Sequence, residues 1–264
     1  MMVQVRLSDG TMLNTRVDGS EGAPWVVMSN SLGADLSMWD GQLDLLARKY
    51  RVLRYDQRGH GASDAPAGPY AFDQLVADVI AIIDHHSVGT ADFVGLSMGA
   101  MTGMGLAIQH PGRFGKMVLA DARAVATDAY KAMWDQRIEA VAAGGVEAVA
   151  EGSLGLWFTE EWRNANPAAT AAARSMIVAT DPGGYINCCH ALRGLDFLRH
   201  LGKVTVPVLY LCGGKDKGAP PEAMQEMAQA TPGSRYVEIP DAGHVANINQ
   251  PEAFNQALAE FLGL

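Results

Sequence analysis

Short apolar runs alternate along most of the chain with longer stretches whose apolar positions recur at helical spacing. The runs fit strands that are buried on both faces of a parallel sheet. Strands are predicted at residues 25–29, 50–55, 91–94, 116–120, 206–211 and 235–239. Between two of them, residues 72–85 place Leu75, Val79 and Ile82 on one face, which predicts an amphipathic helix. This alternation predicts an α/β fold with a doubly wound, mainly parallel sheet.

Two segments depart from the alternation. Residues 3–7 and 11–17 flank Ser8-Asp9-Gly10, and Asp-Gly between two alternating runs predicts a β-hairpin, which brings the sheet to eight strands. Residues 123–200 read as helical and contain no convincing strand. We therefore expect one α/β core, formed by residues 1–122 and 201–264, with residues 123–200 inserted as a helical cap or lid.

The sequence Gly95-Leu96-Ser97-Met98-Gly99 joins one predicted strand to an apolar helix. A Gly-x-Ser-x-Gly pattern between a strand and a helix predicts a sharp turn that exposes the serine hydroxyl. Ser97 is thus the candidate nucleophile of a hydrolase. Such a nucleophile needs two donors for the oxyanion that it creates. We expect these to be the backbone amide of Met98 and the amide of Leu32, in the loop after the strand at residues 25–29.

A serine nucleophile also needs a general base and a group that orients the base. Among seven histidines, His244 follows the last predicted strand, in the chain order of Gly-x-Ser-x-Gly hydrolases. For the acid we favour Asp216, which follows a predicted strand, over the alternative Asp121. Because the carboxyl ends of parallel strands meet in one crevice, these side chains are expected close to Ser97. His60 lies in a glycine-rich loop beside the site, where we expect a scaffold role.

Composition narrows the functions further. The 264 residues are 48% apolar and carry a formal net charge of −9 at pH 7, which argues against partners such as nucleic acid or an anionic membrane. The three cysteines, Cys188, Cys189 and Cys212, are expected as buried thiols in a reducing cytoplasm, and the first residues lack a signal-peptide pattern. The sequence shows neither zinc-type spacing nor a dinucleotide or phosphate loop, so we expect a small-molecule substrate and neither metal nor cofactor. These patterns leave the oligomeric state undetermined.

The Gly-x-Ser-x-Gly motif and the order Ser97, Asp216, His244 resemble the α/β-hydrolase superfamily along essentially the whole chain. Within it, the chain is similar to the 3-oxoadipate enol-lactonases. The similarity is carried by residues 29–33, 38–40, 51–56, 58–63, 157–159, 179–185 and 191–193. The resemblance implies a carboxylic-ester hydrolase that opens a small carboxylated lactone in the β-ketoadipate branch of aromatic catabolism, without a cofactor.

Departures from that family concern the substrate. Ala100 and the segment Thr102-Gly103-Met104-Gly105 differ from the usual residues, and Ala120-Asp121-Ala122 replaces the usual Asn-Thr pair. Since arginine suits carboxylate recognition, we predict Arg193 as the anchor for the substrate carboxylate, with Arg123 as a second candidate. Trp134 and Trp157 are expected either to wall the pocket or only to pack the lid against the core.

Other functions stay open at this point. A general carboxylesterase, or a lactonase or lactamase for another ring, would use the same three side chains. A hydrolase that breaks a carbon–carbon bond of a vinylogous keto-acid would also use this fold and triad. A non-catalytic binding protein on the same scaffold is the alternative from another class, and a fluorophosphonate probe distinguishes it, because only an activated Ser97 reacts.

Overall fold

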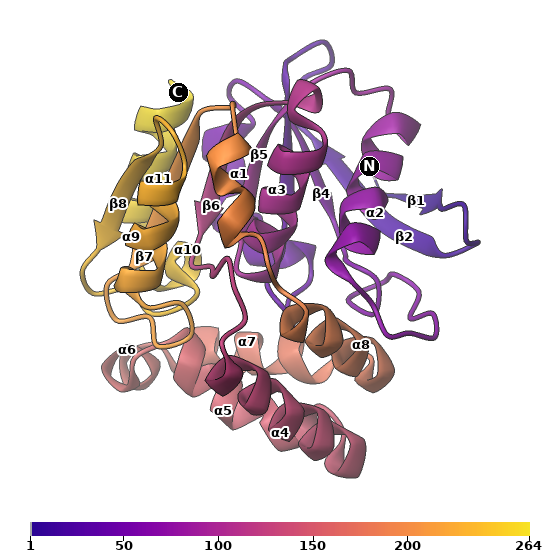
Figure 1. The fold of residues 1–264 in the computed structure, drawn as a ribbon, viewed down its shortest axis with the longest axis vertical. Coiled ribbons are helices and arrows are strands. Elements are labelled where there is room, and N and C mark those ends of the chain that lie inside the picture. The colour runs from indigo at the N-terminus through magenta and orange to yellow at the C-terminus, as the bar shows by residue number, and fades with distance from the viewer. Residues whose placement is uncertain (1) are drawn as a thin grey trace.

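A central sheet of eight strands organises the computed structural model, which describes residues 2–264 (Figure 1). The strands are β1 (Met2–Arg6), β2 (Met12–Asp18), β3 (Trp25–Ser29), β4 (Arg51–Tyr55), β5 (Ala91–Leu96), β6 (Phe114–Ala120), β7 (Val208–Gly213) and β8 (Arg235–Ile239). Their order in the sheet is β1-β2-β4-β3-β5-β6-β7-β8. The pairs β1–β2 and β2–β4 are antiparallel, and every other pair is parallel. The predicted mainly parallel, eight-stranded α/β fold is confirmed.

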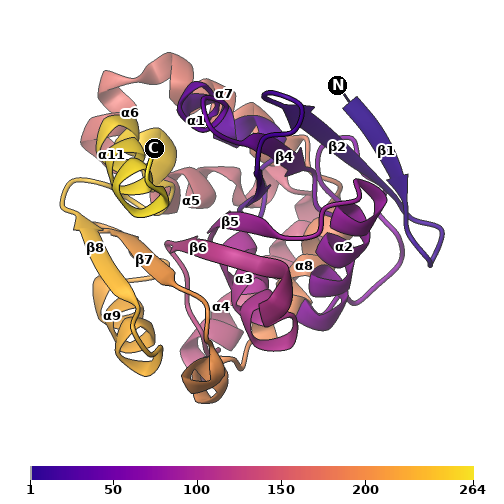
Figure 2. The same cartoon turned by 90° about the horizontal axis from the view of Figure 1, so that it is seen from above.

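Helices cover both faces of the sheet, as a doubly wound fold requires. Figure 2 shows α2 (Phe72–His85), α3 (Met98–Gln109) and α9 (Pro221–Ala230) on one face. On the other face lie α1 (Asp40–Leu46) and α11 (Pro251–Leu262), the latter preceded by the short helix α10 (Ala246–Asn249). The predicted amphipathic helix at residues 72–85 is therefore α2, whose apolar side is buried.

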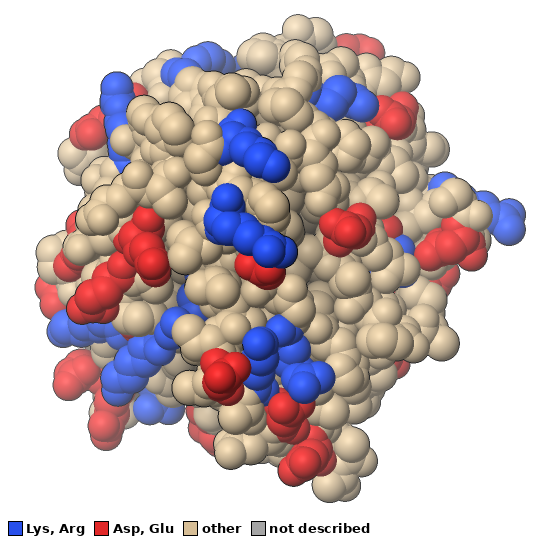
Figure 3. Space-filling model, in the orientation of Figure 1, with Lys and Arg blue, Asp and Glu red and all other residues tan. Residues whose placement is uncertain are grey.

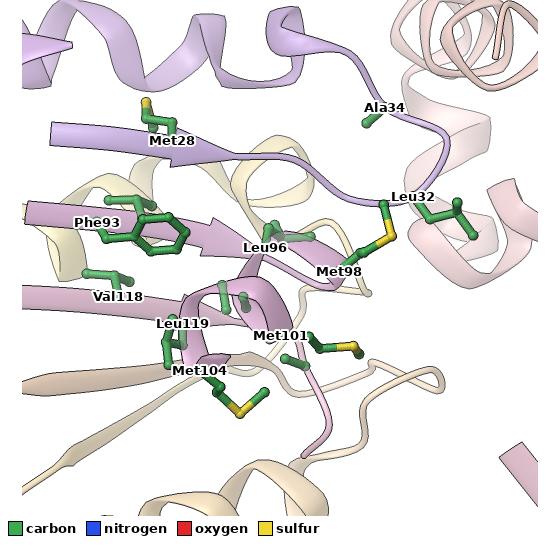
Figure 4. Close-up of a cluster of buried hydrophobic side chains, with 14 of the residues drawn as sticks. Met28, Leu32, Ala34, Phe93, Leu96, Met98, Met101, Met104, Val118 and Leu119 are labelled. Carbon is green, nitrogen blue, oxygen red and sulfur yellow. The ribbon is translucent and has the colours of Figure 1, made fainter. Parts of the chain in front are cut away.

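Helix α3 packs closely against the sheet because glycines lie on its buried side. Phe93 of β5 and Val118 and Leu119 of β6 form a buried cluster with Met104 of α3 (Figure 4). A Cβ atom on Gly103 would lie 2.6 Å from both the Phe93 ring and the Leu119 side chain. The glycines that depart from the enol-lactonase pattern thus have a packing role. Gly103 lets the helix that follows the candidate nucleophile approach β5 and β6, and Gly105 lets it approach Val76 of α2.

Residues 123–200 contain five α-helices and extend past one edge of the sheet (Figure 1). They are α4 (Asp128–Gly144), α5 (Glu147–Trp157), α6 (Glu160–Ala165), α7 (Pro167–Val178) and α8 (Pro182–Arg193). A 3₁₀ helix, η3 (Leu198–Lys203), leads back to β7. The side chains of Thr127 and Asp181 accept amide hydrogen bonds at the starts of α4 and α8. That this segment acts as a lid stays a prediction.

The distribution of charged side chains on the surface and the burial of the cysteines are consistent with the composition. On the face seen in Figure 3, acidic and basic side chains are interspersed. Cys188, Cys189 and Cys212 are unpaired and buried, and burial raises the pKa of each thiol. Within residues 2–264, no helix combines the length and apolarity needed to cross a membrane.

Candidate active site

The backbone at Ser97 takes the sharp turn predicted between β5 and α3. Ser97 has φ 55° and ψ −117°, a strained conformation for a residue with a side chain, which typically costs ~1–3 kcal/mol. Its amide donates to the Ala120 carbonyl of β6 at 2.8 Å. A Cβ atom on Gly95 would lie 2.5 Å from the Gly99 carbonyl oxygen, and one on Gly99 would collide with the Ser29 carbonyl. The two glycines therefore permit the turn that holds the Ser97 hydroxyl at the carboxyl edge of the sheet.

The loops after β7 and β8 bring the other two predicted side chains to Ser97. His244 Nε2 lies 2.8 Å from Ser97 Oγ, and His244 Nδ1 lies 2.8 Å from Asp216 Oδ2. The second oxygen of Asp216 accepts the amides of Gly218 at 2.7 Å and Ala219 at 3.0 Å. All three side chains are buried. With Asp216 accepting at Nδ1, the imidazole carries its proton there and leaves Nε2 free to take the Ser97 proton.

Asp121, the alternative acid, is fully buried beneath the same loops. One carboxylate oxygen accepts the Gly213 amide at 2.7 Å, and the other lies 3.4 Å from the Ala246 amide nitrogen. Burial, with the Asp216 charge nearby, raises the pKa of Asp121 well above its usual range. The structure thus places Asp216 against His244. Asp121 instead joins the end of β7 to the residues that follow His244.

Two backbone amides at this edge are free to bind an oxyanion. The Ser31 amide donates to Met38 Sδ at 3.4 Å and the Gly33 amide to His60 Nε2 at 2.9 Å, but the Leu32 amide between them has no partner within residues 2–264. Met98 is the first residue of α3, so its amide has no intrahelical acceptor. Figure 4 shows both residues on the segments that leave β3 and β5 at the same edge.

A pocket opens beside Ser97 and His244. Its walls carry mainly apolar and aromatic side chains, including Leu32, Met101, Met133, Leu156 and Trp157. Mainly apolar walls with a few polar groups are typical of a site for a small organic molecule. Trp134 and Trp157 both line the cavity, as one of the two alternatives predicted. No group of three or more His, Cys, Asp or Glu residues in the described part of the chain is arranged to hold a metal ion.

Polar donors from α4 also line this cavity. Arg137 donates to Tyr185 Oη at 3.1 Å and to Ser153 Oγ at 2.9 Å, and its guanidinium lies 5.6 Å from the centre of the Trp134 ring. Trp134 Nε1 is buried and has no hydrogen-bond partner among residues 2–264. A half-buried cation and an unused donor on one wall suit a carboxylate.

The predicted anchor Arg193 is not at this wall, which corrects the prediction. Arg193 forms an ion pair with Asp135 at 2.8 Å, its side chain is 37% exposed, and it does not line the cavity. It lies two turns of α8, roughly 12 Å along the helix axis, beyond Tyr185, which does line the cavity. The second candidate, Arg123, instead donates to the Gly218 carbonyl at 2.5 Å and so supports the loop that follows Asp216.

The spacing of residues on α4 is the signal that could have identified Arg137. Tyr130, Met133, Trp134 and Arg137 all line the cavity and follow each other at i, i+3, i+4 and i+7. This spacing places them on one side of the helix. Arg137 was missed because a charged residue at such a position reads as part of a solvated surface.

Comparisons with known proteins agree with this geometry. Residues 24–251 match the family described as the alpha/beta hydrolase fold. The chain is 36% identical over 246 residues to 3-oxoadipate enol-lactonase 2 of Acinetobacter baylyi, covering 93% of this chain and 91% of the relative. It is similar to the crystal structure of the enol-lactonase from Burkholderia xenovorans LB400, with a TM-score of 0.96, 39% identity and coverage of 99% and 100%. A malate-bound thermophilic esterase from Thermogutta terrifontis is similar with a TM-score of 0.92, 28% identity and coverage of 100% and 98%.

Proposed function

The chain belongs to the α/β-hydrolase family, and from this premise we propose that it opens a small carboxylated lactone, 3-oxoadipate enol-lactone or a close analogue, by acyl transfer through Ser97. The observation that carries the proposal is the continuous chain of hydrogen bonds Ser97–His244–Asp216 at a cavity that also presents Arg137 and Trp134 Nε1. The relatives named as enol-lactonases support the proposal that the bond cleaved is the ester bond of a lactone.

In the proposed first half-reaction, His244 Nε2 takes the proton of Ser97 as Oγ attacks the lactone carbonyl. The carbonyl oxygen becomes an oxyanion that the amides of Leu32 and Met98 bind. Asp216 stabilises the imidazolium and holds the ring orientation. When the tetrahedral intermediate collapses, the bond from the carbonyl carbon to the ring oxygen breaks, and His244 gives its proton to that oxygen as an enol. The opened product is then an ester on Ser97.

In the second half-reaction, His244 takes a proton from water as the water oxygen attacks the ester carbonyl. Collapse of this second intermediate breaks the bond to Ser97 Oγ, which recovers a proton from His244. The product leaves as a carboxylic acid, and the enol that formed on the same molecule when the ring opened tautomerises to a ketone. Every proton passes through His244, so no metal or redox cofactor is needed for the balance.

For the substrate class, the proposal rests on the position of Arg137. Its guanidinium is held by Tyr185 and Ser153, so it is positioned before substrate arrives. A planar guanidinium binds a carboxylate with two hydrogen bonds, and Trp134 Nε1 supplies a third donor on the same wall. The remaining walls are mainly apolar, which suits the ring and methylene groups of a small lactone.

The direct test is the Ser97→Ala variant, assayed on the enol-lactone and on aryl acetates. We expect turnover of both substrates to fall by at least ~10⁴-fold, because the nucleophile and the acyl intermediate are lost. A fluorophosphonate probe should label the wild-type protein at Ser97 and leave the variant unlabelled. Substantial residual turnover in Ser97→Ala would overturn the assignment. Wild-type turnover of aryl acetates without any turnover of the lactone would favour a general carboxylesterase.

A further inference from the structure

The loop after β4, residues 56–63, is hydrogen-bonded to the loop that carries Leu32. Asp56 Oδ1 accepts the Leu36 amide at 2.7 Å, and Gln57 Nε2 donates to the Asn30 carbonyl at 2.5 Å. Between these two bonds, His60 Nε2 accepts the Gly33 amide at 2.9 Å. The loop with the candidate oxyanion donor is thus held at its start, middle and end by one neighbouring loop.

The hydrogen bonds of His60 fix its protonation state. Nδ1 lies 3.1 Å from the Arg58 carbonyl oxygen, which can only accept, so Nδ1 carries the proton. Nε2 therefore has a free lone pair for the Gly33 amide. Burial lowers the pKa of His60 to about 4, which keeps its ring neutral at pH 7. His60 is fully buried and does not line the cavity, so it does not touch the substrate.

The bond to His60 acts on the peptides next to the Leu32 amide. The Leu32 N–H belongs to the same peptide plane as the Ser31 carbonyl, which accepts the Ala34 amide at 3.2 Å. The following peptide contains the Gly33 N–H, which His60 holds. Gly33 has φ +77°, a conformation in which the chain would otherwise turn freely. Because the peptide planes on both sides of Leu32 are fixed, the Leu32 N–H points in one fixed direction. Leu32 lines the cavity beside Ser97.

We propose that His60 is a positioning residue for the reaction: by accepting the Gly33 amide, it fixes the Leu32 amide as an oxyanion donor. This inference rests on the function proposed above. It assigns His60 more than the general scaffold role expected from the sequence. The bond acts in the transition state, where the oxyanion forms, and contributes little to substrate binding.

Two substitutions separate the two nitrogens of the ring. In His60→Gln, the side-chain oxygen can occupy the place of Nε2 and still accept the Gly33 amide. In His60→Asn, the shorter amide can replace the Nδ1 bond to the Arg58 carbonyl but cannot reach Gly33. His86→Asn is the matched control, because His86 Nε2 bonds to Thr15 Oγ1 at 3.1 Å on a part of the sheet that does not line the cavity.

Losing an oxyanion donor typically lowers kcat by ~100- to 1000-fold, so a donor that is only misaligned should cost about 10- to 100-fold. We expect His60→Asn to lose this factor in kcat with KM within about twofold, and His60→Gln to keep kcat within about threefold, by the same argument. Inactivation by a phosphonate ester, which forms a tetrahedral adduct on Ser97, should slow in parallel with kcat. His86→Asn should leave kcat and inactivation unchanged.

Equal kcat in His60→Asn and the wild type, or an equal loss in His60→Gln and His60→Asn, would overturn the inference. Nitrogen-15 NMR of histidine in the wild-type protein is a second measurement that needs no variant: a proton on Nε2 of His60 would also overturn it. The proposed function is tested separately by wild-type turnover and Ser97→Ala. An inactive wild type refutes that function, whereas an active wild type with an unaffected His60→Asn refutes only the positioning role.

Discussion

Replacing Arg137 with methionine tests whether the wall formed by α4 recognises a carboxylate. Methionine keeps most of the apolar stem of arginine and removes the head that donates to Tyr185 and Ser153. A hydrogen bond to a charged group contributes ~1.5–3 kcal/mol. We expect Arg137 to form two such bonds with the substrate carboxylate. Because Arg137 is only half-buried, the two bonds together should contribute about 2–3 kcal/mol rather than their full sum. At 1.36 kcal/mol for each factor of ten, this is a loss of about 30- to 150-fold in kcat/KM.

The assay compares two substrates and two variants. For the enol-lactone, the loss should lie mainly in KM, because the carboxylate is bound similarly in the ground state and the transition state. For phenyl acetate, which has no carboxylate, Arg137→Met should keep kcat/KM within about threefold. Arg193→Met is the control, since Arg193 forms only an exposed pair with Asp135, and such pairs contribute ~0–1 kcal/mol. It should keep kcat/KM within about twofold on both substrates.

Two results would refute this reasoning. One is an equal loss by Arg137→Met on both substrates, which would mean that the residue supports the cavity rather than the carboxylate. The other is a loss in Arg193→Met that matches the loss in Arg137→Met. Arg137→Lys adds a further check, because it keeps the charge but loses the planar pair of donors, so its kcat/KM should fall between the values for the wild type and Arg137→Met.

Three further predictions concern the acid, the pH dependence and the packing of α3. Asp216→Asn should lower kcat by about 10⁴-fold, because an amide cannot hold the His244 tautomer, whereas Asp121→Asn should lower kcat by less than ~10-fold. Steady-state kinetics distinguish the two variants, and equal losses of kcat would contradict the assignment of Asp216 as the acid. Burial lowers the pKa of His60 from 6.5 to about 4, so as pH falls through this range the unfolded chain takes up a proton that the folded chain does not. The free energy of unfolding should therefore decrease by ~2–3 kcal/mol more between pH 7 and pH 4.5 in the wild type than in His60→Gln, as measured by urea titration, and equal decreases would refute the shift. Gly103→Ala forces a Cβ atom against Phe93 and Leu119 and should destabilise the fold by ~1–2 kcal/mol. Gly41 in α1 has open space around it, so Gly41→Ala should stabilise the fold by up to ~1 kcal/mol. Thermal melts compare the two variants, and the reverse order of stability would contradict the packing argument.

Features set by the parallel sheet could be predicted from the sequence. Ser97, Asp216 and His244 are far apart in the chain, but each follows a strand, and the carboxyl ends of parallel strands meet at one edge. The 2.8 Å contacts of His244 with the other two show that this argument located the side chains correctly. The order of these three residues along the chain, together with the glycines around Ser97, was sufficient to predict that their side chains meet.

The cavity wall was harder to predict because it depends on how the inserted helices are rotated. A helix can turn about its axis without any change in its sequence pattern, so an arginine such as Arg193 can face solvent while Arg137 lines the cavity. The rotation of α4 is set by packing against other helices of the insertion, such as the contact of Arg137 with Tyr185 of α8. Such contacts join residues about 50 positions apart, so the spacing on α4 groups Arg137 with Trp134 on one side of the helix but does not say that this side faces the cavity.

Ser97 and Asp121 show what a local pattern adds at the edge of the sheet. Both follow parallel strands that pair with each other, and both have positive φ, 55° and 48°. At Ser97 the flanking glycines indicate the tight turn, and the hydroxyl is available to His244. At Asp121 the neighbours are alanines, which gave no sign that the carboxyl would turn inward to accept backbone amides. The sequence therefore left Asp121 as an alternative acid for the site, whereas its carboxyl is buried beneath the loops and does not line the cavity. The end of a strand predicts where the backbone of a residue lies. Whether its side chain then points into the active site or stabilises the fold depends on the hydrogen-bond partners around it.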